Sequence, residues 1–64
     1  MRLTDFWARM ERRFGATYAR SYAADMVLGE LGSRTVDQAL AQGEDAKTVW
    51  RAVCDATRAP ASER

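Results

Sequence analysis

The chain has 64 residues, with one cysteine, no histidine and a formal net charge of +1. These numbers exclude histidine-based zinc sites, His-dependent catalytic triads and disulfide frameworks. Hydrophobic residues make up 47% of the chain and only one proline is present, which predicts one small globular domain. The near-neutral charge gives no general argument for binding to nucleic acid or to an anionic membrane.

The N-terminal region has no apolar run that fits a signal peptide, because charged residues recur from Arg2 to Arg13. No other segment is apolar for long enough to predict a membrane-spanning helix. A single unpaired cysteine suits a reducing compartment. We therefore expect a cytoplasmic protein without a membrane partner.

Two helices are predicted in the first half of the chain, over residues 4–14 and 16–31. In the first, Thr4 is the expected N-cap and Gly15 the expected C-terminal stop. The apolar residues recur with the spacing of one helical face. This face contains Leu3, Phe6, Trp7, Met10 and Phe14 in the first helix and Ala19, Tyr22, Ala23, Met26 and Val27 in the second.

Two further helices are predicted over residues 35–42 and 45–58. Thr35 and Gln38 have the spacing of a capping box at the start of the third helix, and Gly43 ends it. Asp45 is the expected N-cap of the fourth helix, and Pro60 prevents the helix from continuing.

The expected fold is therefore all-α, because no strand-like alternation is present. We expect a compact four-helix mini-domain over residues 1–59 and a flexible C-terminal tail over residues 60–64. The last two helices are expected to be arranged like a helix-turn-helix. The predicted core consists of Leu3, Phe6, Trp7, Met10, Phe14, Tyr22, Met26, Val27, Leu31, Val36, Leu40, Val49, Trp50 and Val53.

Nothing in the sequence predicts catalysis. The nine carboxylates fall mostly on polar faces or at helix starts, where acidic residues are usual. Cys54 lies beside Val53 on an apolar face, and the chain has no histidine that could activate it. We therefore expect a protein that is not an enzyme, with no catalytic residues, no metal site and no cofactor.

Six arginines outnumber four acidic residues in residues 1–34. Arg9, Arg12 and Arg13 lie roughly opposite the apolar face of the first helix, and Arg20 belongs to the second helix. A solvated helix face is the plain interpretation of this patch. Because arginine is enriched at interfaces, we single out these four residues as the candidate protein contact. The expected partner is another protein, with a homodimer as a further possibility.

The second half offers an alternative. Ala39-x-x-x-Gly43 followed by Thr48-Val49-x-Arg51 resembles the helix-turn-helix of bacterial repressors. Acidic Glu44 and Asp45 stand where such a motif would meet DNA, and residues 35–64 hold four basic and five acidic residues. Nucleic-acid binding through Lys47 and Arg51 is therefore second to protein binding.

Several motifs also suggest a family. They are Met1-Arg2-Leu3-Thr4-x-Phe6-Trp7, Arg13-Phe14-Gly15, Val27-Leu28-x-Glu30-Leu31-Gly32 and Arg34-Thr35-Val36-x-x-Ala39-Leu40-x-x-Gly43-Glu44-Asp45 with Val49-Trp50-Arg51-Ala52-Val53-Cys54. Over about residues 1–56 the chain resembles the DUF3046 family of small intracellular helical proteins from Actinobacteria. The resemblance implies a stand-alone helical protein, often encoded near a recombinase and its RecX-type regulator. It links the nucleic-acid alternative to DNA recombination and repair, and it implies no functional residues.

Overall fold

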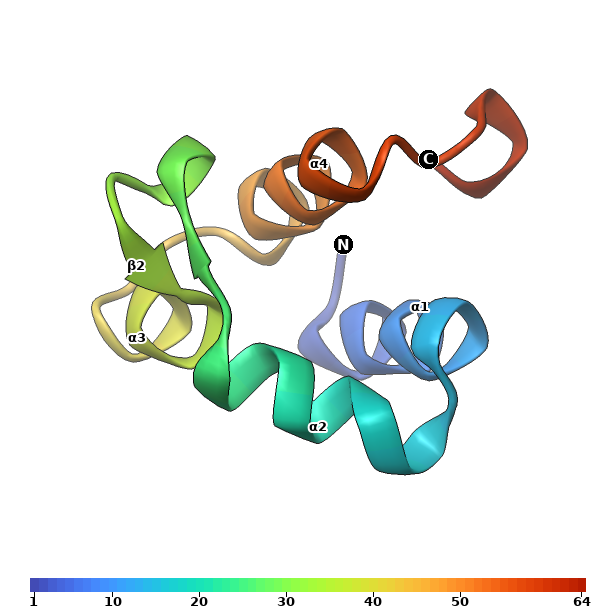
Figure 1. The fold of residues 1–64 in the computed structure, drawn as a ribbon, viewed down its shortest axis with the longest axis horizontal. Coiled ribbons are helices and arrows are strands. Elements are labelled where there is room, and N and C mark those ends of the chain that lie inside the picture. Colours follow the sequence, from blue (N-terminus) through green and yellow to red (C-terminus); the bar gives the residue numbers. More distant parts are fainter.

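The first two helices follow each other with a single residue between them. In the computed structural model, which describes residues 1–64, α1 spans Leu3–Phe14 and α2 spans Ala16–Asp25 (Figure 1). The residue between them, Gly15, has φ +89°, a backbone conformation that other residues rarely adopt. The expected stop at Gly15 is confirmed. The expected N-cap is wrong, because Arg2 occupies that position and Thr4 lies inside the first turn.

The second helix is shorter than predicted. After Asp25 come strand β1 (Val27–Leu28), a 3₁₀ turn (Gly29–Leu31) and strand β2 (Arg34–Thr35). The strands pair antiparallel, with Val27 opposite Thr35. The prediction of a helix over residues 16–31, and of no strands, is therefore wrong for residues 26–35.

The burial of two leucines accompanies this difference. The chain reverses after Asp25 and buries Leu28 and Leu31, which are 4% and 3% exposed. Met26 and Val27, both predicted in the core, are 44% and 56% exposed.

The last two helices agree with the sequence prediction within one residue at each end. Helix α3 spans Val36–Ala41 and α4 spans Ala46–Thr57. The capping box is confirmed, since the Thr35 hydroxyl accepts from the Gln38 N–H and the Gln38 side chain accepts from the Thr35 N–H. Asp45 takes the N-cap position of α4 without a side-chain hydrogen bond. The helix-turn-helix arrangement stays a prediction.

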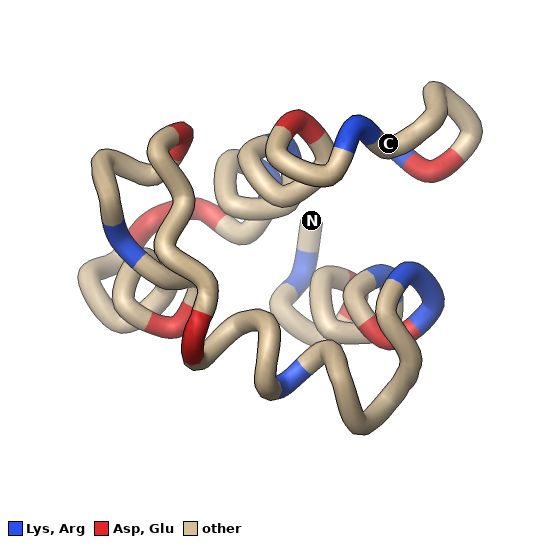
Figure 2. Tube along the Cα trace, in the orientation of Figure 1, with Lys and Arg blue, Asp and Glu red and all other residues tan.

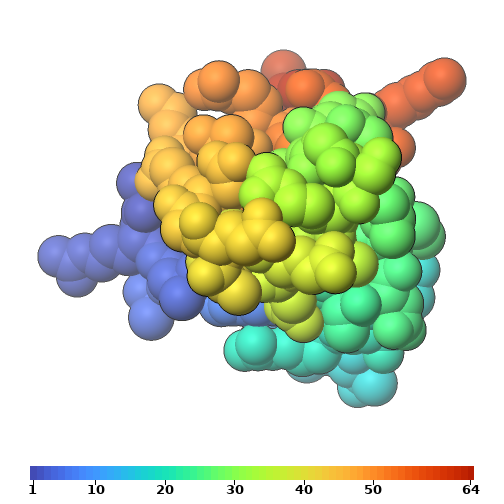
Figure 3. Space-filling view, turned by 90° about the vertical axis from the view of Figure 1, so that its left-hand side faces the viewer, coloured from blue at the N-terminus to red at the C-terminus, as the bar shows by residue number.

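One core of sixteen buried hydrophobic residues joins these elements. Helix α4 lies opposite α1, α2 runs along the lower edge, and α3 closes the left side with the two strands (Figure 1). The space-filling view of that left side shows α3 in yellow against the green strand segment, with α4 above and α2 below (Figure 3). A small, mainly α-helical domain is therefore confirmed. Leu3 was predicted in the core but is exposed, whereas Trp7, Phe14 and Leu40 pack against the core while partly exposed.

The longest helices have twelve residues, and none of the helices combines the length and apolar character that a bilayer span requires.

Residues 61–63 form a second 3₁₀ turn after Pro60. This turn lies beyond the end of α4 and makes contacts with α1 and α4 that are described below. The predicted flexibility of residues 60–64 stays a prediction.

The two threonines near helix starts give a matched test of capping. We expect Thr35→Ala to lower the free energy of unfolding by about 1 kcal/mol, because it removes the hydroxyl that caps α3. Thr4→Ala should change it by less than about 0.5 kcal/mol, because Thr4 is an exposed residue without a capping bond. Urea denaturation followed by circular dichroism measures both. Equal losses would show that the capping box contributes nothing specific.

Candidate functional site

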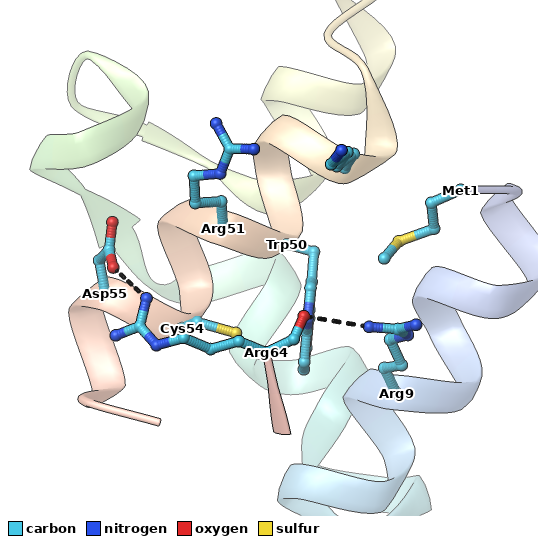
Figure 4. A pocket seen from close by; sticks show the side chains of 8 residues that line it. Met1, Arg9, Trp50, Arg51, Cys54, Asp55 and Arg64 are labelled. Carbon is cyan, nitrogen blue, oxygen red and sulfur yellow. Dashed lines mark hydrogen bonds and ion pairs between the residues drawn. The ribbon is translucent and has the colours of Figure 1, made fainter. Parts of the chain in front are cut away.

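Two adjacent hollows lie between α1 and α4, with volumes of about 510 and 370 Å³. Both are lined by Arg9, Trp50 and Arg64, and we refer to the two hollows together as the α1–α4 groove. Figure 4 shows the lining of the larger hollow. The larger hollow is also lined by Met1, Lys47, Arg51, Cys54 and Asp55, and the smaller one by Arg12, Ser62 and Glu63. The groove therefore brings together residues from α1, α4 and the C-terminal turn.

The basic residues of the groove come from helical faces with regular spacing. Lys47 and Arg51 are four residues apart on α4, and Arg9 and Arg12 are three apart on α1, so each pair shares one side of its helix. Lys47 and Arg51 are exposed and make no hydrogen bond or ion pair. Of the ten basic residues, all but Arg20, Arg34 and Arg64 lie in α1, in α4 or beside their ends, and Figure 2 shows the basic residues in blue.

The carboxylates of the groove are already paired. Asp55 Oδ1 lies 2.6 Å from Arg64 Nη1, and this hydrogen bond raises the pKa of Arg64 further above its usual high value. Glu63 Oε1 lies 3.1 Å from Arg13 Nη1. Arg12, Lys47 and Arg51 therefore face the groove without a partner, whereas Arg9 donates to the main-chain oxygen of Arg64. The groove carries an excess of positive charge.

The structure separates the four arginines of the predicted protein contact. Arg9 and Arg12 line the groove. The Arg13 side chain is only 17% exposed and donates to the Thr57 hydroxyl and main-chain oxygen, both at 3.0 Å, so it ties α1 to the end of α4. Arg20 lies on α2, with its guanidinium carbon 3.7 Å from the centre of the Trp7 ring, where it makes a cation–π contact.

The candidate nucleic-acid contacts, Lys47 and Arg51, line the same groove as Arg9. The structure also changes the interpretation of Glu44, which we expected to repel phosphate. Its carboxylate lies 2.7 Å from Arg34 Nη2, so its charge is paired. Asp45 has no such partner.

The sequence does not predict the part of the groove made by the C-terminal turn. The main-chain oxygen of Arg64 accepts hydrogen bonds from Arg9 Nη1 at 3.2 Å and from Trp50 Nε1 at 3.3 Å. The sequence gives only an indirect indication, because a buried tryptophan normally has a hydrogen-bond acceptor for its indole N–H. It does not indicate which carbonyl is that acceptor.

Cys54 borders the larger hollow and is fully buried. Burial raises the pKa of its thiol, so the reactive thiolate is disfavoured at neutral pH. No group of three or more His, Cys, Asp or Glu side chains is placed to hold a metal ion. Guanidinium and ammonium groups such as those of the groove can bind an anion.

Fold and groove together define a small, mainly α-helical domain with a cationic surface. The chain belongs to the family described as "Protein of unknown function (DUF3046)", whose model matches residues 1–62. The predicted family is thereby confirmed, and only Glu63 and Arg64 of the groove lie outside the matched range. No curated protein matches the chain, and no solved structure does.

Two neighbouring arginines should differ in their effect on stability. We expect Arg13→Ala to lower the free energy of unfolding by about 1–2 kcal/mol, because it removes three hydrogen bonds between α1 and the C-terminal part of the chain. Arg12→Ala should change it by less than about 0.5 kcal/mol. Urea denaturation of the two variants makes the comparison. Similar losses would contradict the structural role of Arg13.

Proposed function

We propose that this chain is a non-catalytic protein-binding module that holds an acidic segment of another protein in the α1–α4 groove. The observation that carries this proposal is the meeting of Arg9, Arg12, Lys47 and Arg51 at one groove whose carboxylates are already paired. Such a binding module is suited to a regulatory role.

An acidic segment fits the chemistry of these four side chains. Three are arginines, whose planar guanidinium groups bind a carboxylate through two parallel hydrogen bonds. The side chains come from two helices that the core holds in place, so their spacing is fixed before a ligand arrives. Opposite charges also accelerate the encounter between the partners.

Cys54 supports two further parts of the proposal, namely that the module is not catalytic and that it acts in the cytoplasm. The groove contains one cysteine, and its raised thiol pKa makes it a poor nucleophile. A free, buried cysteine is also compatible with a reducing compartment.

Nucleic-acid binding is the second candidate function, because Lys47 and Arg51 are exposed and unpaired on α4. The Arg34–Glu44 pair also favours it, since Arg34 offsets the negative charge of Glu44 that would repel phosphate. The unpaired Asp45 at the start of α4 opposes it. Nucleic acid bound through four cations would show a slope of about −3.6 when log affinity is plotted against log salt concentration. A link to DNA recombination and repair belongs to this candidate.

A charge-reversal experiment tests the proposal. The probes are a fluorescein-labelled hexaglutamate peptide and a 20-base-pair DNA duplex, and binding is measured by fluorescence anisotropy at several salt concentrations. We expect the double variant Arg12→Glu with Arg51→Glu to bind the peptide about tenfold more weakly, because several charge pairs of up to about 1 kcal/mol change sign.

Arg2→Glu with Arg58→Glu is the matched control, since it changes the net charge equally at exposed residues outside the groove. It should change peptide affinity by less than about threefold. Equal losses in the two variants would show that only net charge matters and would contradict the proposed groove.

Tighter binding of the duplex than of the peptide, with the steep salt slope, would favour the second candidate. Sedimentation of the free chain as a dimer would identify a second copy as the partner.

A further inference from the structure

The C-terminal turn forms part of the wall of the α1–α4 groove, because Ser62, Glu63 and Arg64 line the smaller hollow. The Glu63 carboxylate accepts from Arg13 Nη1 at 3.1 Å. The Arg64 main-chain oxygen accepts from Arg9 Nη1 at 3.2 Å and from Trp50 Nε1 at 3.3 Å. The acidic side chain of Glu63 is therefore bound by Arg13, which lies beside the groove. The main-chain oxygen of the next residue is bound by Arg9 and Trp50, which line the groove, and Figure 4 shows the Arg9 contact.

We propose that residues 61–64 are a resident ligand of the groove, and that an acidic peptide of a partner protein binds by displacing them. This inference rests on the proposed function and specifies its ligand. The partner segment is extended and presents an Asp or Glu to Arg13, with the carbonyl of its next residue bound by Arg9 and Trp50. Further acidic residues of the segment are held by Lys47 and Arg51, at the other end of the groove.

The turn is built in a way that allows displacement. Residues 60–64 are all exposed, and the turn has two internal backbone hydrogen bonds, from Glu63 N to Pro60 O at 2.9 Å and from Arg64 N to Ala61 O at 3.3 Å. Its side chains form two ion pairs: Arg64–Asp55, with side chains 43% and 47% exposed, and Glu63–Arg13, with side chains 40% and 17% exposed. An ion pair as exposed as Arg64–Asp55 contributes little stability in water. The donors beneath the turn belong to packed helices, so they remain in place when it leaves.

Arg64→Ala distinguishes displacement from simple electrostatics. The substitution releases the turn from Asp55, but it also removes one cation of the groove and leaves the Asp55 carboxylate unpaired. Charge alone therefore predicts weaker binding of hexaglutamate, whereas displacement predicts binding about threefold tighter or more, because a larger fraction of the molecules has an open groove. Arg58→Ala is the control, because it removes the same charge from a side chain without a hydrogen bond or ion pair. It should not tighten binding.

The inference is supported if Arg64→Ala binds hexaglutamate more tightly than the unmodified chain does. It is also supported if the variant binds the peptide and the unmodified chain does not. Unchanged or weaker binding by the variant, with the unmodified chain still binding the peptide, would overturn the resident-ligand role and leave the proposed function standing. Failure of both chains to bind would overturn both. As a second readout, NMR relaxation at saturating peptide should give residues 61–64 order parameters below about 0.6. A turn that stays ordered in the complex would contradict displacement.

Discussion

The packing of Trp50 against Phe6 joins the last helix to the first, and the rest of the structure depends on this contact. The ring centres are 6.2 Å apart in an edge-to-face arrangement, with Phe6 fully buried and Trp50 3% exposed. In a domain whose core has sixteen residues, two aromatic side chains supply a large part of the buried surface. Because α4 is held against α1 in this way, cations of the two helices line one groove, and Trp50 lines it as well.

Structural and binding roles are therefore divided among side chains that look equivalent in the sequence. Arg9, Arg12 and Arg13 lie on one helix within two turns, but Arg13 is used to tie α1 to Thr57, whereas Arg12 is free of any partner. Arg9 is intermediate, since it lines the groove and also holds the C-terminal turn. A domain of this size has few residues to spare for function alone, so the groove is made partly from contacts that stabilise the fold.

The sequence predicts what depends on local periodicity and capping. Helices α1, α3 and α4, the Thr35 capping box and the stop at Gly15 follow from the residues within one or two turns. The strands at residues 27–28 and 34–35 could not be predicted in this way, because two residues are too few for an alternating pattern. The groove was half predictable: Arg9, Arg12, Lys47 and Arg51 were singled out, but on two separate surfaces. Their meeting, and the contacts of Asp55 and Arg64, depend on how distant segments pack.

The most direct test of this account is a map of backbone and indole N–H chemical-shift changes when hexaglutamate is added to the ¹⁵N-labelled chain. The account predicts that the largest changes fall on residues 9–13, 47–55 and 61–64, and that the Trp50 indole N–H moves because its acceptor is exchanged. The Trp7 indole, beneath Arg20 and outside the groove, should move little. Changes centred on α2, α3 or the two strands would contradict the assignment of the α1–α4 groove as the binding surface.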